Sequence, residues 1–301
     1  MSSLLLDEPH KAGYKSSIVA LDTTPGPSRR PPNQFPAIVY HAANSTALAL
    51  SATPSTPPIL HHVPGVPGAM LITDVLSTSE CIDLVSMSET VGMIEDKPIG
   101  GSAAELNSIL AHNLILLAPP QLIDPLFSRI SHLLPSHLPV PAGSKSSGAL
   151  VGINRRFRIY RYREGSVYRP HVDGAWPSSS EIAASEDGTT PAQYVYDADP
   201  KVYSRFTFLL YLNDSFQAGQ TTFFVPDPNR DGVIDARPVR PIQGAALIFP
   251  HGATEGSLLH EGSPVFPSEL EGAKYVIRTE VLYEVDRMAS AGEGGVVGGL
   301  V

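Results

Sequence analysis

The stretch from Arg158 to Pro177, RIYRYREGSVYRPHVDGAWP, places an imidazole and a carboxylate two residues apart, at His171 and Asp173. Side chains on an extended chain repeat with a period of two, so these two groups point the same way. A divalent iron that must also bind a chelating substrate uses two histidines and one carboxylate and keeps its other positions open. The stretch therefore predicts two of three protein ligands, although a solvated loop pair has the same spacing.

The third ligand must come from a distant histidine. His260 fits, because it lies in LLHEGSPV, directly before the strand-like stretch KYVIRTEVLYE. His251, in FPHG after a short apolar run, is the alternative.

Five segments surround these residues in a fixed order: RFRIYRYREGSVYRPHVDG, RFTFLLYLNDSFQAGQTTFF, GAALIFPHG, LLHEGSPV and GAKYVIRTEVLYE. Together they resemble the catalytic domain of the 2-oxoglutarate- and Fe(II)-dependent dioxygenases, specifically the prolyl 4-hydroxylase-like group. The resemblance covers about residues 150 to 285. It implies a mainly β fold with supporting α-helices, whose core is a double-stranded β-helix of the jelly-roll or cupin-like kind. It also places the third ligand in LLHEGSPV, at His260 and not at His251.

The resemblance further implies roles for individual residues. The Fe(2+) ligands, which form the catalytic centre, would be His171, Asp173 and His260. Lys274 matches the cation that binds the far carboxylate of 2-oxoglutarate, although the turn before it, VFPSELEGA, is longer than in the family. Arg278 lies four residues on, on the same strand face, and is the alternative cation. The hydroxyls that match cosubstrate-binding positions belong to Thr207, Tyr211 and Tyr162.

The activity that the resemblance implies is hydroxylation of a C–H bond. O2 and 2-oxoglutarate would be cosubstrates, succinate and CO2 would be released, and L-ascorbate would keep the iron reduced. Peptidyl proline is the substrate closest to the family name. A small metabolite or a free amino acid is the alternative, because the substrate side of such a scaffold lies in loops that carry no motif. A non-catalytic metal-binding or sensing protein on the same fold is a third interpretation.

Composition limits the partners. The 21 basic residues against 30 acidic ones give a formal charge of −9, so nucleic acid is not expected as a partner. The single cysteine, Cys81, excludes a disulfide within the chain. No apolar window is long enough for a membrane span, and the N-terminus lacks a secretory signal pattern. We therefore expect a cytoplasmic or nuclear protein.

The chain divides into four parts by composition. The predicted parts are a flexible Pro/Ser/Thr-rich leader at residues 1–58, a helical support region at 59–147, the dioxygenase domain at 148–287 and a disordered Gly-rich tail at 288–301. Within the leader, Pro36–Ala42 is one candidate short strand. In the support region, Ser77-Thr78-Ser79-Glu80 has the pattern of a helix capping box, and a second helix is predicted after Pro119-Pro120.

In the third part, β-branched and aromatic residues alternate over strand lengths. Strands are predicted at Arg156–Tyr162, Arg205–Asn213, Ala245–Phe249 and Lys274–Tyr283. The polar segment Ser178–Pro200 is predicted to be a long loop that acts as a lid or substrate selector. Trp176 would either line the substrate entrance or cover the end of the sheet.

A last motif lies between two predicted strands, at residues 227–235. Its Asp227-x-Asn229-x-Asp231-Gly232 spacing is that of the first part of a calcium loop. Pro238 stands where a bidentate glutamate would be needed, so a polar hairpin turn is favoured and calcium is the alternative.

Overall fold

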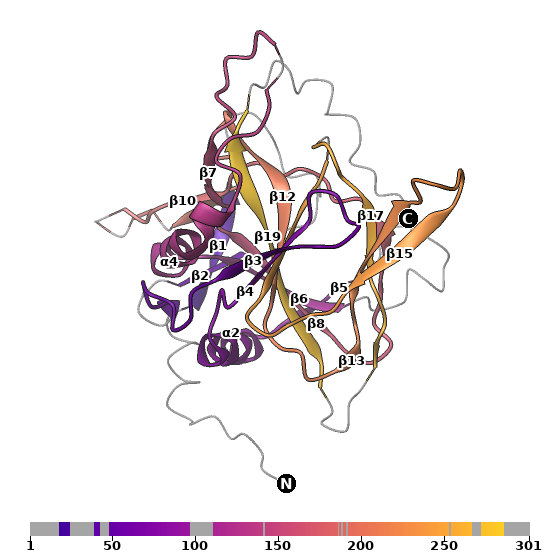
Figure 1. The fold of residues 1–301 in the computed structure, drawn as a ribbon. Helices are drawn as coiled ribbons and strands as arrows, with labels where there is room; N and C mark the ends of the chain where they lie inside the picture. Colours follow the sequence, from indigo (N-terminus) through magenta and orange to yellow (C-terminus); the bar gives the residue numbers. More distant parts are fainter. Residues whose placement is uncertain are drawn as a thin grey trace, which may run out of the picture.

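The computed structural model describes residues 18–24, 39–42, 48–96, 111–140 and 142–285, except 186, 188, 191, 253 and 267–271. Strands are the main regular structure of the described chain, and two α-helices pack on one side of them (Figure 1). In this part of the chain no helix has the length and apolar character that crossing a membrane requires.

Eight strands in two antiparallel sheets form the core. They are β8 (Arg156–Tyr162), β9 (Tyr168–His171), β12 (Val202–Tyr211), β14 (Thr221–Pro226), β15 (Ile234–Val239), β16 (Ala246–Pro250), β17 (Leu259–Gly262) and β19 (Lys274–Glu284). One sheet has the order β8-β19-β12-β16 and the other β9-β17-β14-β15. Apart from the β14–β15 hairpin, each of these strands is followed by one in the opposite sheet. This winding is that of a jelly roll, and the predicted double-stranded β-helix is confirmed.

Shorter strands extend the larger sheet on both sides. Beyond β16 lie β4 (Met70–Thr73) and β3 (Ile59–His62). Beyond β8 lie β6 (Ala111–Leu117), β2 (Val39–Ala42), β1 (Ile18–Thr24), β11 (Gln193–Val195) and β10 (Ser180–Ile182). Two more pair at its sides, β5 (Ile94–Asp96) with β6 and β7 (Leu150–Ile153) with β19. Separately, β13 (Gln217–Ala218) pairs with β18 (Val265–Phe266).

The structure shows strands within three segments for which the sequence analysis predicted mainly a flexible leader, helices or a loop. The leader predicted for residues 1–58 contributes β1 and β2, of which only β2 lies within the anticipated strand. The helical region at 59–147 also contains β3 to β6, and the predicted loop Ser178–Pro200 contains β10 and β11. These strands are short, and pairing with neighbours defines them more than their own sequence does. The tail predicted at 288–301 lies outside the described residues.

Both predicted helices begin where the sequence places them. Helix α2 (Thr78–Val91) is capped by Ser77, whose Oγ accepts from the Glu80 N–H at 3.3 Å while the Glu80 carboxylate accepts from the Ser77 N–H at 2.8 Å. This reciprocal pair is the predicted capping box. Helix α4 (Pro120–Ile130) has proline at its first position and is followed by the 3₁₀ turn η2 (Ser131–Leu133).

Both faces of the larger sheet are buried, which explains the nearly continuous apolar strands. On β12, Phe206, Phe208 and Leu210 pack in the cluster that includes the buried residues of α2 and α4. Leu209 and Tyr211 alternate with them and pack between the two sheets. The space between the sheets therefore receives every second residue of β8, β12 and β19, and the site described below lies there.

Arg129 on α4 holds the start of α2 in place. Its buried guanidinium donates to the two carboxylate oxygens of Glu80 at 2.7 and 3.0 Å and to the carbonyls of Val75 and Ser51 at 2.8 and 2.6 Å. Arg129→Met keeps much of the volume but leaves these acceptors without their donor. We expect it to lower the free energy of unfolding by about 3 kcal/mol, measured by urea denaturation at pH 7.

The control for this variant is Arg161→Met. Arg161 pairs with Glu89 at 2.7 Å, but the Glu89 side chain is 39% exposed, and exposed pairs contribute about 0–1 kcal/mol. Burial raises the pKa of Glu80, but the hydrogen bonds from Arg129 and Ser77 outweigh burial and keep this pKa below its ordinary value of 4.5. The Arg129 contribution should therefore shrink as the pH falls below 4.5. Equal losses in the two variants at pH 7 would contradict this account.

Candidate metal centre

The pairing of β9 with β17 brings two histidines together. His171 and His260 are directly opposite in the antiparallel register, and their ring centroids lie 4.4 Å apart. Asp173 follows β9 and turns its carboxylate toward both rings, with Oδ1 3.2 Å from His171 Nε2 and Oδ2 3.5 Å from His260 Nε2. One ligand atom from each of the three residues lies within 4.8 Å of the others. The structure thus assembles the three side chains that the sequence marks as metal ligands.

The two imidazoles are oriented for this purpose by their own strands. His171 Nδ1 lies 2.6 Å from the Arg169 carbonyl, and His260 Nδ1 lies 3.2 Å from the Leu258 carbonyl. A carbonyl only accepts, so each Nδ1 carries a hydrogen, and in the neutral imidazole, the form that binds a metal, each Nε2 has the lone pair. Both lone pairs face the carboxylate of Asp173. Two neutral imidazoles and a carboxylate suit a divalent transition metal, and backbone carbonyls behind the histidines are the usual outer partners.

Asp173 is buried and ionised. Burial raises its pKa, but the charge of Arg278 holds the pKa well below its usual value of 3.8. Arg278 donates to Oδ1 at 2.6 Å, and the hydroxyl of Thr207 donates to Oδ2 at 2.7 Å. The carboxylate is therefore held from both oxygens and remains a negatively charged ligand.

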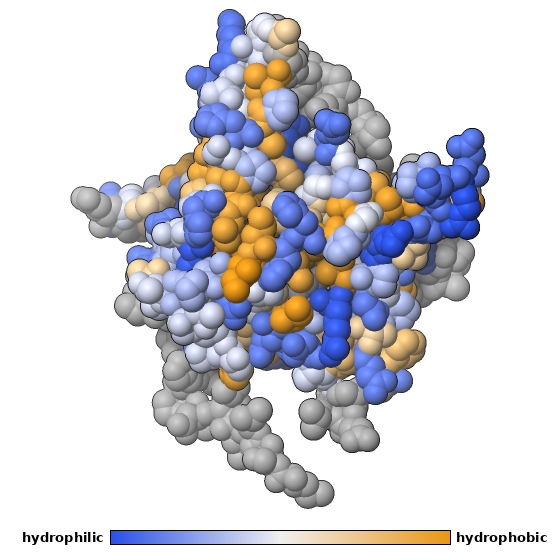
Figure 2. Space-filling model, viewed as in Figure 1, coloured by the Kyte–Doolittle hydropathy of each residue, from blue (hydrophilic) through white to orange (hydrophobic). Residues whose placement is uncertain are grey.

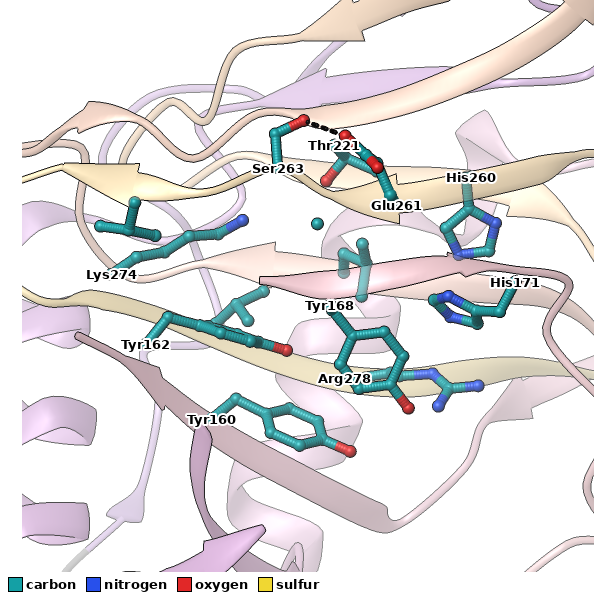
Figure 3. A pocket seen from close by; sticks show the side chains of 14 residues that line it. Tyr160, Tyr162, Tyr168, His171, Thr221, His260, Glu261, Ser263, Lys274 and Arg278 are labelled. Atoms are coloured by element: carbon teal, nitrogen blue, oxygen red, sulfur yellow. Dashed lines mark hydrogen bonds between the residues drawn. The ribbon is translucent and has the colours of Figure 1, made fainter. Parts of the chain in front are cut away.

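A cavity extends from this centre between the two sheets. Figure 3 shows His171 and His260 at one end of it and Lys274 at the other, with tyrosines along one wall. Besides these three, the polar residues that line it are Tyr160, Tyr162, Tyr168, Thr221, Glu261, Ser263 and Arg278. Leu209, Val265 and Val276 make its walls partly apolar.

Lys274 is a buried cation whose charge no carboxylate of the described residues balances. Its side chain is 4% exposed, and Nζ donates to the Gly219 carbonyl at 2.7 Å. The rings of Tyr162 and Tyr211 lie on either side, with centroids 5.5 and 5.8 Å from Nζ. Burial lowers the pKa of Lys274 to about 7. An anion that entered this end of the cavity would favour the charged form.

The turn that presents this carbonyl is strained. Ala218 and Gly219 have φ angles of 58° and 62°, in the region that side chains disfavour. A Cβ on Gly219 would lie 2.8 Å from the Phe216 ring, so glycine is required there. Ala218 tolerates its conformation at some cost, and the turn directs the Gly219 carbonyl to Lys274.

The predicted cosubstrate hydroxyls occupy different places. Tyr162 lines the cavity beside Lys274. Tyr211 lies just behind the wall, where its hydroxyl is 2.8 Å from Oγ1 of Thr221, a lining residue that the sequence analysis missed. Thr207 does not line the cavity, because its hydroxyl is bound to Asp173. Strand pairing of β14 with β17 places Thr221 opposite Gly262. The only sequence signal for this is the stretch AGQTTFF, whose last four residues begin β14.

The structure also distinguishes between the alternative site residues that the sequence offered. Arg278 lies at the metal end with Asp173, so Lys274 is the cation at the far end. His251 is outside the group of potential ligands. Trp176 does not line the cavity; the Arg156 guanidinium lies 4.4 Å from its ring centre and Tyr196 packs edge-on.

The calcium-like motif forms the tip of the β14–β15 hairpin. Figure 2 shows this tip as a strongly hydrophilic projection. Asp227 pairs with Arg230 at 2.6 Å, and Asp235 pairs with Arg237 at 2.7 Å. Two of its carboxylates are thus already balanced by arginines, as a polar hairpin turn requires.

No family model and no curated protein sequence matches the chain. Among solved structures, it is similar to the viral collagen prolyl hydroxylase of Paramecium bursaria Chlorella virus-1 in its 2OG complex, with 18% identity, 72% of this chain and 96% of that chain covered, and a TM-score of 0.41. An oxidoreductase of the 2OG-Fe(II) oxygenase family from Burkholderia pseudomallei shows 14% identity, coverages of 73% and 88%, and a TM-score of 0.39.

HygX from Streptomyces hygroscopicus, with nickel, 2-oxoglutarate and hygromycin B bound, shows 13% identity, coverages of 73% and 84%, and a TM-score of 0.39. At identities this low, the fold and the site geometry of the chain itself are the basis for a function.

Asp173→Asn tests the metal centre. The substitution keeps the shape but removes the negative charge, so we expect Co(II) affinity, followed by visible spectroscopy, to fall by more than about 100-fold, the upper end of what an outer partner contributes. Asp235→Asn, on the hairpin, is the matched control and should leave the affinity unchanged. Similar affinities in the wild type and Asp173→Asn would rule out this centre.

Proposed function

We propose that the protein is a 2-oxoglutarate- and Fe(II)-dependent dioxygenase that hydroxylates a C–H bond and releases succinate and CO2. The observation that carries the proposal is the placement of a three-ligand centre and a buried lysine, which has no counter-ion among the described residues, at opposite ends of one cavity. 2-Oxoglutarate has matching ends, since a keto group beside one carboxylate chelates a metal and the other carboxylate needs a cation.

The three ligands would hold Fe(2+) through the two Nε2 atoms and the carboxylate of Asp173. Three protein ligands leave positions for a chelating cosubstrate and for O2. When bound, the iron supplies the activation of O2 that is coupled to decarboxylation of 2-oxoglutarate, and L-ascorbate would restore its ferrous state. Arg278 and Thr207 keep the carboxylate ionised and fixed, so its charge remains available to the metal.

At the other end, Lys274 would bind the far carboxylate of the cosubstrate. An ammonium has three hydrogens to donate, and the Gly219 carbonyl takes one of them. The Thr221 hydroxyl lies in the same part of the cavity and is supported from behind by Tyr211, and Tyr162 covers one side. The apolar walls between the two ends exclude water and strengthen these interactions.

Peptidyl proline is the prime substrate that we propose to test first, because the order of motifs in the sequence resembles that of prolyl 4-hydroxylases. Free amino acids and small metabolites form the second panel. Formation of succinate that depends on Fe(II), O2 and 2-oxoglutarate, and that rises with one of these substrates, would support the proposal. Binding of metal and 2-oxoglutarate without any succinate would instead indicate a non-catalytic sensing protein.

Lys274→Met removes the cation while keeping an unbranched side chain. A hydrogen bond to a charged group contributes about 1.5–3 kcal/mol, so we expect the affinity for 2-oxoglutarate to fall roughly 10- to 150-fold. Co(II) affinity should stay at the wild-type value, because Lys274 lies at the opposite end of the cavity. An unchanged 2-oxoglutarate affinity would exclude this role for Lys274.

The lowered pKa of Lys274 predicts a pH dependence. Without ligand the lysine loses its proton as the pH rises through about 7, and the dicarboxylate binds the protonated form. The dissociation constant of 2-oxoglutarate should therefore rise about tenfold per pH unit above this point. Lys274→Arg, whose guanidinium stays charged, should flatten the profile between pH 7 and 9. Parallel profiles for both proteins, measured by calorimetry with metal-loaded samples, would contradict the assignment.

A further inference from the structure

His251, which the metal centre does not use as a ligand, is held at both ring nitrogens by hydroxyl groups. It directly follows β16 and is buried, with 1% of its surface exposed. Nδ1 lies 2.9 Å from Thr207 Oγ1, and Nε2 lies 2.8 Å from Ser204 Oγ. Both hydroxyls come from β12 and are fully buried. A buried imidazole with two matched partners in the interior has a defined hydrogen-bonding state.

The direction of each hydrogen bond follows from its two ends. The Thr207 hydroxyl gives its only hydrogen to the ionised carboxylate of Asp173, so its oxygen must accept from His251 Nδ1–H. At the other end the Trp176 N–H donates to Ser204 Oγ at 2.7 Å. A neutral imidazole has a single N–H, so Nε2 accepts and the Ser204 hydroxyl donates to it.

The imidazole of His251 is neutral in this arrangement. Burial lowers its pKa to about 4; the nearby charge of Asp173 opposes this shift, and Arg278 and Arg205 reinforce it. Four hydrogen bonds then run in one direction, from the Trp176 N–H through Ser204, His251 and Thr207 to Asp173 Oδ2. Hydrogen bonds aligned head to tail polarise one another, so the last donor is stronger than an isolated hydroxyl.

We propose that His251 is a positioning residue that acts through Thr207 to fix the orientation of the Asp173 carboxylate in the metal centre. This chain of four hydrogen bonds holds Oδ2, while Arg278 holds Oδ1. Together they fix the plane of the carboxylate, so that it faces the two histidines. The backbone supports the same geometry, because the Gly252 N–H donates to the Asp173 carbonyl at 2.9 Å. The inference rests on the proposed metal-binding role of Asp173.

The hydrogen-bond chain predicts how substitutions of its members change metal affinity. Outer partners of metal ligands contribute about 10- to 100-fold to affinity, and this range should apply to both His251→Leu and Thr207→Val. Thr207→Ser retains the hydroxyl and should retain affinity close to that of the wild type. His251→Asn keeps a donor toward Thr207 but not the acceptor for Ser204, so it should lie between the wild type and His251→Leu.

The deciding test is a double-mutant cycle on Co(II) dissociation constants, with the visible Co(II) spectrum as a second readout. Because His251 acts only through Thr207, the double variant His251→Leu/Thr207→Val should bind Co(II) no more weakly than Thr207→Val alone. Urea unfolding of the metal-free variants separates stability from affinity. If His251→Leu does not fold, Ser204→Ala takes its place in the cycle, because Ser204 donates to His251 in the hydrogen-bond chain.

Two results would overturn the inference. One is an unchanged Co(II) affinity and spectrum in His251→Leu, while Asp173→Asn abolishes binding. Where Ser204→Ala replaces His251→Leu, the same result in Ser204→Ala counts. The other is full additivity of the two single changes, which would mean independent packing effects. If Asp173→Asn itself binds Co(II) as tightly as the wild type, the metal centre fails, and the proposed function fails with it.

Discussion

The carboxylate of Asp173 is ionised and buried between the two sheets, and the surrounding structure compensates its charge. An isolated carboxylate in such a place would be very costly, so it must be paired and hydrogen-bonded. Arg278 from β19 supplies the opposing charge and Thr207 from β12 supplies a hydrogen bond. His171 and His260 approach from the smaller sheet. Strands of both sheets thus converge on one group.

The two ends of the cavity differ in a way that fits a ligand with two unlike ends. At the Asp173 end, charges are paired within the protein, and the chelating ligand atoms face inward. At the Lys274 end, a buried ammonium donates to the Gly219 carbonyl, its one hydrogen-bond acceptor among the described residues, and has tyrosine rings around it. An amine in this setting is easily deprotonated, whereas Arg278 keeps its charge under all ordinary conditions. In the proposed function, the far carboxylate of 2-oxoglutarate would supply the negative charge at this end.

Much of this arrangement could be predicted from the sequence, because alternation in a strand identifies the face of each residue. The strands β8 and β19 and the shared face of His171 and Asp173 follow from such alternation, and the capping box of α2 follows from its own motif. The third ligand, His260, is assigned through the family resemblance and not through alternation. However, alternation does not show which group of the site each residue reaches from its position along the strand. Thr207 and Tyr211 share a face of β12, yet four residues span about 13 Å, so one reaches Asp173 and the other lies beside Thr221.

Other features depend on contacts between distant segments. The strands β1, β2, β10 and β11 form through pairing with partners that local sequence does not identify. The role of His251 depends on β12 and β16 lying side by side, with Phe206 opposite Pro250, so a histidine in FPHG has no readable function from sequence alone. Register and strand crossing, not residue type, decide these cases.

The most direct test of the central claim is anaerobic titration of the Fe(II)-loaded protein with 2-oxoglutarate, followed by visible absorption spectroscopy. Chelation of ferrous iron by the keto acid produces a weak metal-to-ligand charge-transfer band. The proposed site predicts that the band appears with one equivalent of 2-oxoglutarate in the wild type and is absent in Asp173→Ala. Absence of the band in fully iron-loaded wild-type protein would contradict the assignment of the cavity as a 2-oxoglutarate site.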